Sequence, residues 1–235
     1  MGESEKAGPI VALVPMRHHS ERVPGKNYRL VAGRPLYAYI LDVLSQVPEL
    51  SQIVVDTDSQ TIREGLADKF PSVRILERPE ALRGDYVPMN DILVHDAGKV
   101  PAGMYLQTHS TNPLLRPATI SRAIAALRAA PDHESLFSVT RVQARLWSAE
   151  GIPINHNPAE LLRTQDLPPM FLENSCLYLV GREDLLTRRN RLGRNPLMFP
   201  LDAAEAWDID EEFDLKVVEC LLRERGRRPS IGGEP

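Results

Sequence analysis

The sequence is poor in features that mark disulfide-bonded, membrane-spanning or nucleic-acid-binding proteins. Two cysteines, Cys176 and Cys220, are too few for a disulfide framework and suit a reducing compartment. No run approaches the roughly 18 apolar residues of a membrane span, and the charged residues 1–6 lack the apolar core of a signal peptide. Aromatic residues make up 6% and the formal net charge is −4, which disfavours a basic nucleic-acid surface. We therefore expect a soluble cytoplasmic protein without a membrane or nucleic-acid partner.

Several common catalytic motifs are also absent. The chain has neither the Gly-x-Gly-x-x-Gly fingerprint of dinucleotide-binding folds nor a Gly-x-Ser-x-Gly nucleophile elbow. Gly25-Lys26 is followed by Asn27 instead of Ser or Thr, so this segment is not a Walker A loop. These absences exclude the motif-defined dinucleotide enzymes, P-loop NTPases and α/β-hydrolases.

The apolar segments that are present alternate between strand-like and helix-like patterns. Short runs that are apolar on both faces are typical of buried parallel strands. The expected strands are residues 10–14, 52–56, 73–76, 104–107, 135–140 and 175–180. Apolar residues at helical spacing, with caps at Ser59 or Asp58 and Pro117 at a helix start, predict the intervening helices. The expected helices lie around residues 36–47, 59–66, 117–127 and 211–225. This alternation predicts an α/β fold with a mostly parallel central sheet flanked by helices.

One domain is expected to hold nearly the whole chain. A chain of 235 residues buries about 70% of its unfolded surface and can form a single large core. We place this domain at residues 9–225, between a flexible N-terminus, 1–8, and a flexible tail, 226–235. Residues 142–172 are rich in proline, asparagine and charge and have weak periodicity. They predict an excursion from the sheet, which could be a flap or lid, a small β-insert or an oligomerisation arm.

A basic loop directly follows the first expected strand. It carries four cations and two neutral donors, Arg17, Arg22, Lys26, Arg29, Ser20 and Asn27. Ligands of open α/β sheets bind at the carboxyl ends of the strands, and guanidinium and ammonium groups match phosphate oxygens. A solvated loop that pairs with surface acids is the alternative. The position of the whole set in an acidic protein favours a polyphosphate site.

Two carboxylates near the end of the chain form the second candidate cluster. In an extended segment Asp208 and Asp210 would lie on one face, because strand side chains alternate. Such a pair suits Mg²⁺, which is usually shared between one or two carboxylates and substrate phosphates. The alternative is an acidic start of the last helix, with Asp210 as its cap. The basic loop favours the metal site, because a polyphosphate site commonly uses a metal ion.

Five motifs, in chain order, together resemble one enzyme family. They are Arg17-x-x-Ser20-x-Arg22-x-Pro-Gly-Lys26-Asn27, Arg78-Pro-Glu-x-Leu-x-x-Asp85, Gln107 with the following Pro113-Leu114, Arg163-x-Gln165-Asp-Leu-Pro, and Asp208-Ile-Asp210 with Asp214. The pattern is similar to that of the acylneuraminate (sialic acid) cytidylyltransferases. Glu173-Asn174-Ser175 departs from it, because Asn-Gly is usual there, and the Gln107 loop is longer than the usual form.

The resemblance implies a Rossmann-like nucleotidyltransferase domain and a homodimer with residues 142–172 as the dimerisation arm. It also implies a Mg²⁺-dependent reaction in which CTP and an α-keto acid sugar give a CMP-sugar and pyrophosphate. The implied catalytic residues are Arg17, Lys26, Asp208 and Asp210, the last two as metal ligands. The implied nucleotide contacts are Arg17, Ser20, Arg22, Lys26, Asn27, Arg78 and Asp85. The implied contacts to the acidic sugar are Gln107, Arg163, Gln165 and Asn174.

The sequence leaves the acceptor and the base open. The same chemistry could act on ketodeoxyoctulosonate, on a pseudaminic or legionaminic type sugar, or on another small acid, and another nucleoside triphosphate could replace CTP. A non-catalytic nucleotide-binding module is the alternative from another class. An intact Asp208-Ile-Asp210 pair argues against it.

Overall fold

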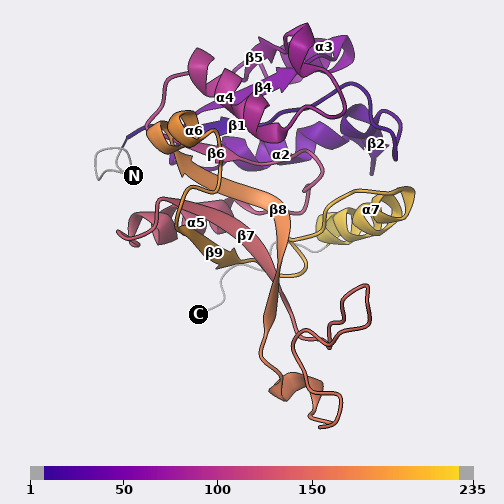
Figure 1. Cartoon of the computed structure of the whole chain (residues 1–235). Helices are drawn as coiled ribbons and strands as arrows, with labels where there is room; N and C mark the ends of the chain where they lie inside the picture. Colours follow the sequence, from indigo (N-terminus) through magenta and orange to yellow (C-terminus); the bar gives the residue numbers. More distant parts are fainter. Residues whose placement is uncertain (1–7, 228–235) are drawn as a thin grey trace.

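A seven-stranded sheet with helices on both faces forms the centre of the computed structural model, which describes residues 8–227 (Figure 1). The strand order is β5-β4-β1-β6-β8-β7-β9. The bounds are β1 Ile10–Leu13, β4 Leu50–Thr57, β5 Arg74–Glu77, β6 Met104–Gln107, β7 Ser135–Val142, β8 Met170–Gly181 and β9 Pro196–Pro200. Only β8 runs antiparallel to its sheet neighbours. The predicted mostly parallel α/β fold is therefore confirmed.

Six α-helices and a small hairpin complete the described chain. The helices are α2 Leu36–Ser45, α3 Gln60–Lys69, α4 Met89–Lys99, α5 Pro117–Arg128, α6 Arg182–Arg188 and α7 Glu212–Arg227. The hairpin pairs β2 Leu30–Val31 with β3 Arg34–Pro35, and short 3-10 turns are η1 Lys26–Tyr28, η2 Glu80–Leu82 and η3 Thr164–Asp166. None of the helices within residues 8–227 is long and apolar enough to cross a membrane.

The apolar run of β1 explains why this strand lies at the centre of the sheet. Ile10 and Ala12 face one helical layer, in which α2, α3 and α5 pack. Val11 and Leu13 face the other layer, which α4 and α6 cover. All four side chains are buried, so both faces of β1 contribute to the core. A strand with apolar residues at every position is stable only in such a setting.

A third apolar cluster attaches the end of the chain to the start of the chain. Val23, from the loop after β1, packs with Ile209, which precedes α7, and with Leu215 and Val218 of α7. These side chains are buried. The cluster therefore fixes the segment that carries Asp208 and Asp210 against the basic loop.

Several predicted boundaries are corrected by the structure. Helices α4 and α6 and strand β9 were not predicted from the sequence, since α6 has only seven residues and β9 has proline at both ends. Proline suits an edge strand such as β9, where a missing N–H costs no ladder hydrogen bond. Ser59, not Asp58, caps α3 through a hydrogen bond from the Ile62 N–H. Helix α7 continues to Arg227, past the expected boundary at 225, and residues 1–7 and 228–235 of the expected flexible ends lie outside the described residues.

The predicted excursion is an arm that projects from the sheet. Strands β7 and β8 continue beyond the sheet body, where Val142 pairs with Met170, and lead to a loop-rich tip (Figure 1). The two strands are therefore longer than predicted and form the base of the arm. The arm exposes several large apolar side chains, among them Trp147, Ile152, Ile154, Leu161 and Leu172.

Candidate active site

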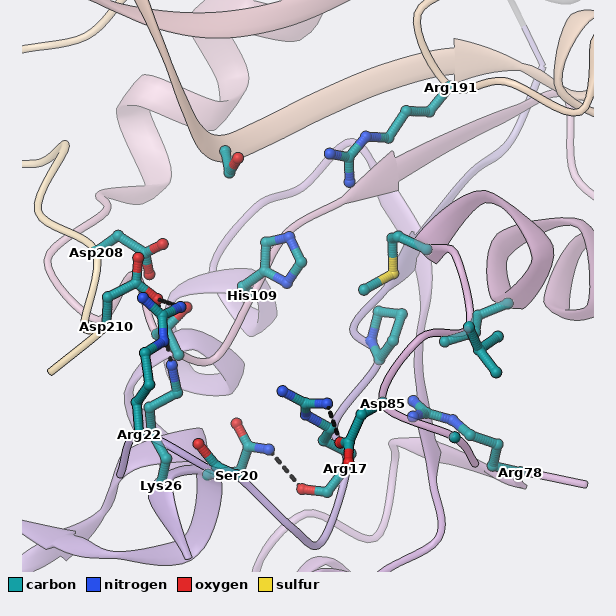
Figure 2. Close-up of a pocket in the computed structure, with 18 residues that line it drawn as sticks. Arg17, Ser20, Arg22, Lys26, Arg78, Asp85, His109, Arg191, Asp208 and Asp210 are labelled. Atoms are coloured by element: carbon teal, nitrogen blue, oxygen red, sulfur yellow. Dashed lines mark hydrogen bonds and ion pairs between the residues drawn. The ribbon is translucent and has the colours of Figure 1, made fainter. Parts of the chain in front are cut away.

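A cavity of about 420 Å³ lies at the carboxyl ends of the parallel strands (Figure 2). Pro15 and Arg17 follow β1, Arg78 follows β5, and His109 and Thr111 follow β6, so the strand directions bring their loops together. Nine residues predicted from the sequence line this cavity: Arg17, Ser20, Arg22, Lys26, Asn27, Arg78, Asp85, Asp208 and Asp210. The basic loop and the acidic pair thus share one cavity, although Arg22 and Asp210 are 188 residues apart in the chain.

Charge pairs join the basic loop to the acidic segment. Arg22 Nη2 lies 2.6 Å from Asp210 Oδ1, and Lys26 Nζ lies 3.7 Å from the same oxygen. Lys26 Nζ also donates to the Ile209 carbonyl at 2.6 Å. Ile209 is buried while the carboxylates on either side of it line the cavity, as expected for alternating side chains. We call Arg22, Lys26, Asp208 and Asp210 the paired wall.

Burial and charge act in opposite directions on the paired wall. Burial lowers the pKa of Lys26, while Asp208 and Asp210 raise it. Burial also raises the pKa of Asp208, and a hydrogen bond with Thr111 and the charge of Lys26 oppose this shift. The Ile209 N–H donates to the Thr111 carbonyl at 3.0 Å, so the loop after β6 holds this segment in place. The wall is therefore a compact set of mutually compensated charges.

The carboxylates of the paired wall fit a Mg²⁺ ion that is shared with a phosphate. Asp208 Oδ1 is buried and has no hydrogen-bond partner, a costly arrangement that a cation would relieve. Within residues 8–227 no group of three or more His, Cys, Asp or Glu side chains could hold a metal. Two carboxylates are what Mg²⁺ needs from a protein when substrate oxygens and water supply the remaining ligands.

Asn27 and Gly25 give the basic loop its shape. The Asn27 side chain donates to the Arg17 carbonyl and accepts from the Ser110 hydroxyl, both at 2.6 Å. Gly25 has a φ of 66°, and a Cβ there would lie 2.9 Å from the Tyr28 ring. A side chain at position 25 would therefore meet both backbone strain and a clash. The loop is held rigidly enough to present its cations toward one cavity.

Arg78 is held at the far end of the cavity by a buried acidic pair. Its Nε donates to Asp56 Oδ1, and Asp56 interacts electrostatically with the buried carboxyl of Asp96, whose oxygens have no other hydrogen-bond partner in the described part of the chain. Burial and the Asp56 charge raise the pKa of Asp96 to about 8, so Asp96 carries the proton of this pair at neutral pH. Nearby, Arg17 Nη1 pairs with Asp85 Oδ1 at 2.7 Å.

Another wall of the cavity contains residues that the sequence analysis missed. It consists of His109, Ser175 and Arg191, which we call the Arg191 wall. They come from three separate segments: His109 lies in the loop that begins at Gln107, Ser175 follows Asn174, and Arg191 belongs to no motif. The departure at Ser175 from the usual Asn-Gly and the arginine-rich run around 188–194 were the available signals.

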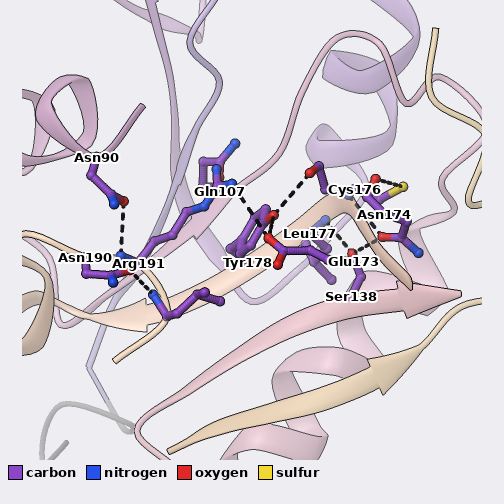
Figure 3. Close-up of polar contacts among 12 residues, drawn as sticks. Asn90, Gln107, Ser138, Glu173, Asn174, Cys176, Leu177, Tyr178, Asn190 and Arg191 are labelled. Carbon is purple, nitrogen blue, oxygen red and sulfur yellow. Dashed lines mark hydrogen bonds and ion pairs between the residues drawn. The ribbon is translucent and has the colours of Figure 1, made fainter. Parts of the chain in front are cut away.

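Two predicted sugar contacts lie behind this wall and do not line the cavity. Gln107 is 1% exposed, and its side chain connects Arg191 to His109. Asn174 accepts from the Ser138 hydroxyl and the Cys176 N–H (Figure 3). It also donates to the Thr140 hydroxyl, so it stabilises the irregular pairing of β7 and β8. Both residues were predicted to contact the sugar directly. In this structure they position the residues that reach the cavity.

Arg163 and Gln165 lie on the arm, outside the cavity of their own chain. The Arg163 side chain is 73% exposed and makes two hydrogen bonds to the Asp166 carboxylate, at 2.7 and 3.1 Å. Within one chain, these two residues therefore do not reach the cavity where the sugar is expected to bind.

The fold and the cavity together define a class of protein. A basic loop at the carboxyl end of β1 and an acidic pair facing it over a mostly parallel sheet are the parts that a nucleotidyltransferase needs. Solved structures agree on the fold. A CMP:2-keto-3-deoxy-manno-octonic acid synthetase complexed with CTP superposes with a TM-score of 0.70 at 16% identity, covering 92% of this chain and 99% of that chain. A 4-diphosphocytidyl-2C-methyl-D-erythritol synthase gives 0.66 at 16% identity, covering 91% and 98%.

Sequence comparison identifies the family. The sequence model of the family described as Cytidylyltransferase matches residues 11–219, so the chain belongs to the cytidylyltransferases. It is 26% identical to the CMP-N,N'-diacetyllegionaminic acid synthase of Legionella pneumophila, covering 91% of this chain and 96% of the relative. It is 20% identical to the N-acylneuraminate cytidylyltransferase of Escherichia coli, covering 93% of this chain and 53% of the relative.

Proposed function

We propose that this cytidylyltransferase activates an acidic α-keto sugar of the sialic or legionaminic type with CTP. The anomeric hydroxyl oxygen bonds to the α-phosphorus of CTP, the bond from that phosphorus to the β-phosphate oxygen breaks, and pyrophosphate leaves. The hydroxyl proton passes to water, and the product is a CMP-sugar. The observation that carries this proposal is the meeting of Arg22 and Lys26 with Asp208 and Asp210 at one cavity.

Positioning and charge neutralisation are the work of the basic loop in this reaction. Arg17, Arg22 and Lys26 come from one rigid loop, so they can contact adjacent phosphates of a single triphosphate. Phosphate oxygens compete with Asp210 for Arg22 and Lys26, and the growing charge on pyrophosphate strengthens those contacts. Arg78 and Asp85, at the far end of the cavity, are assigned to the nucleoside, and Ser20 and Asn27 to the triphosphate.

The metal role falls to Asp208 and Asp210. These carboxylates would hold Mg²⁺, which would neutralise charge on the α-phosphate and lower the pKa of the attacking hydroxyl. His109 does not serve as the base, because its Nε2 accepts a hydrogen bond from the Gln107 amide at 2.8 Å. Burial and the nearby cations also lower the pKa of His109 to about 3, so this ring is a weak proton acceptor.

Coverage of the relatives favours a nonulosonic acid over the eight-carbon alternative. The legionaminic acid synthase and the E. coli N-acylneuraminate cytidylyltransferase each align with more than nine-tenths of this chain. Two 3-deoxy-manno-octulosonate cytidylyltransferases, from Geobacter sulfurreducens and Escherichia coli, align with 52% and 74% of it, at 29% and 26% identity. The reaction would take place in the cytoplasm, consistent with the two free cysteines.

A homodimer formed through the arm is part of the proposal. The arm, residues 142–172, exposes apolar side chains that a second copy would cover, and Leu161 is 91% exposed. A dimer would also give Arg163 and Gln165 a route to a neighbouring cavity. Sedimentation should find a dimer for the natural chain and a monomer for Leu161→Glu; a natural chain that sediments as a monomer contradicts this part.

A panel of acceptors and nucleotides tests the reaction. N-acetylneuraminate, N,N'-diacetyllegionaminate and ketodeoxyoctulosonate are each combined with CTP, UTP, ATP and GTP in the presence of Mg²⁺. Pyrophosphate release is measured, and the product is identified by mass spectrometry. We expect release with CTP and a nonulosonic acid. Binding of CTP without turnover for any acceptor would instead favour a non-catalytic nucleotide-binding module.

A further inference from the structure

Arg191 differs from the other cations of the cavity in the groups that it contacts. Among the described residues, five cationic side chains line the cavity, and Arg17, Arg22, Lys26 and Arg78 each have a carboxylate partner. Arg191 Nη1 instead donates to the neutral Gln107 Oε1 at 2.7 Å. Its nearest carboxylate contact, to Glu173 Oε1, is 4.0 Å long, and that oxygen already accepts from the Tyr178 hydroxyl.

The Arg191 side chain is fixed before any ligand arrives. Its guanidinium lies 3.6 Å from the centroid of the Tyr178 ring, within the range of a cation–π contact. On the backbone, Asn90 Oδ1 at the start of α4 accepts the Arg191 N–H at 3.2 Å (Figure 3). The side chain is only 17% exposed. A guanidinium held from both ends loses little conformational freedom on binding.

The surroundings of Arg191 compensate its positive charge only weakly, because the Glu173 carboxylate is 4.0 Å away and already accepts from the Tyr178 hydroxyl. His109, its neighbour across Gln107, stays neutral because its pKa is far below 7. Met89 and Ile92, which line the same cavity from α4, are apolar. Figure 2 shows the guanidinium pointing into the cavity from a different side than Asp208 and Asp210. An anion at this place would meet a desolvated guanidinium with donors to spare, since Gln107 uses one of its five N–H groups.

We propose that Arg191 binds the carboxylate of the acceptor and so makes the enzyme specific for acidic sugars. This inference rests on the proposed function, because it takes an acidic sugar as the acceptor. The paired wall would hold the triphosphate, and Arg191 would orient the sugar from the other side. Gln107 and Tyr178 are positioning residues in this arrangement, because they hold Arg191 and do not line the cavity.

Arg163 is the competing candidate for binding the carboxylate of the acceptor, because the resemblance implies that it contacts the acidic sugar. It sits on the arm, exposed, with both contacts of its guanidinium made to Asp166, and it could reach a cavity only in a neighbouring chain. Arg191 is already in the cavity and lacks such a close partner. The two assignments therefore make different predictions for the same experiment.

The experiment measures discrimination between an acid and its neutral analogue. The natural enzyme, Arg191→Gln, Arg191→Lys and Arg163→Gln are assayed at saturating CTP with the best acceptor of the panel and with its methyl ester. We expect the natural enzyme to prefer the acid. Arg191→Gln should lower kcat/KM for the acid by about 10- to 100-fold, mainly through KM, because a charge-assisted bidentate contact is lost. The ester should be unaffected, so the discrimination collapses.

The other variants and readouts separate the remaining outcomes. Arg191→Lys keeps the positive charge but lacks the planar guanidinium that binds a carboxylate through two hydrogen bonds. It should prefer the acid over the ester more than Arg191→Gln does, which would show that the site is folded. Arg191→Gln should leave the KM for CTP unchanged. Loss of discrimination in Arg163→Gln but not in Arg191→Gln, or a raised KM for CTP in Arg191→Gln, would overturn the assignment. Absence of turnover by the natural enzyme with every acidic acceptor would instead remove the proposed function itself.

Discussion

The two walls of the cavity hold positive charge in opposite ways. On the paired wall Arg22 and Lys26 lie against Asp210, so each charge there has a partner from a distant part of the chain. On the Arg191 wall the guanidinium is held by an amide and an aromatic ring. A ligand at the paired wall must exchange partners, which suits a polyphosphate that arrives with a metal cation. A ligand at the Arg191 wall meets a prepared cation, which suits a simple anion.

Removing the Asp210 carboxylate from the paired wall should have the largest effect on turnover. Asp210→Ala should reduce pyrophosphate release by about 10²- to 10³-fold, the usual loss for a central charged contact. The variant takes away a proposed metal ligand and the partner of Arg22 and Lys26 together. CTP should still bind, since the basic loop remains. Steady-state turnover and calorimetric titration with CTP measure the two quantities separately.

Glu212→Gln is the matched control for this change. Glu212 lies two residues further on, at the start of α7, and pairs with Arg29, neither of which lines the cavity. Its turnover should equal that of the natural enzyme. Full activity in Asp210→Ala would remove Asp210 from the catalytic site, whatever the control shows.

A carboxylate next to Arg191 should convert the Arg191 wall into a second paired wall. Gln107→Glu places a carboxylate where the amide now accepts from Arg191 at 2.7 Å. The guanidinium would then be neutralised within the protein, and the KM for the acceptor should rise about 10- to 100-fold. Gln107→Leu removes the same hydrogen bond without adding charge and should have a smaller effect. Equal effects of the two substitutions would mean that the weakly compensated charge of Arg191 is not what the acceptor uses.

The contrast between the walls also explains what the sequence could predict. The cations Arg17, Arg22 and Lys26 of the basic loop lie within ten positions of one another directly after a strand, and the acids of the paired wall are separated by one residue. Such local spacing survives folding, so each cluster could be recognised separately. Their meeting at one cavity was expected because a polyphosphate site commonly uses a metal ion and because of the resemblance, and the structure confirms it. The central strands were equally readable, because β1 is apolar on both faces.

The Arg191 wall could not be read in this way. Its members belong to three segments that meet only when β8 crosses antiparallel between β6 and β7. Gln107 and Asn174 stand in positions expected for ligand contacts, but they are buried behind the residues that line the cavity. A polar residue can face a cavity or lie behind the residue that does. Packing decides between the two, and packing cannot be inferred from the spacing of residues in the sequence.

Arg78 belongs to neither wall. Like the cations of the paired wall it has a carboxylate partner, and like Arg191 it is mostly shielded from solvent, so we expect its surroundings to make stability depend on pH. Its partner Asp56 is supported by Asp96, whose pKa is raised to about 8. Between about pH 4 and pH 8 the folded chain therefore binds one proton more than the unfolded chain. From this pair the free energy of unfolding should fall by about 1.4 kcal/mol for each pH unit on going up through that range.

Asp96→Asn should remove this slope while keeping a hydrogen-bond donor next to Asp56. Denaturant unfolding at pH 6, 7 and 8 should show a flatter profile for the variant than for the natural chain. Asp68→Asn, an exposed position on α3, is the control and should keep the natural slope. Parallel profiles for the natural chain and Asp96→Asn would show that the buried pair does not share a proton.

The smallest expected effect concerns the backbone of the Arg191 wall. Ser175 has a φ of 56°, a left-handed conformation that favours glycine, at the position where the resemblance leads us to expect glycine. Its hydroxyl is in hydrogen-bond contact with the Tyr178 hydroxyl at 3.2 Å, while the Tyr178 proton is donated to Glu173 and the Tyr178 ring lies against the Arg191 guanidinium. Comparing Ser175→Gly with Ser175→Ala isolates the backbone cost, since both variants lose the hydroxyl. The glycine variant should be more stable by about 1 kcal/mol in denaturant unfolding. Equal stabilities would mean that the left-handed backbone carries no cost there, leaving the contacts around Arg191 as the factor that shapes this wall.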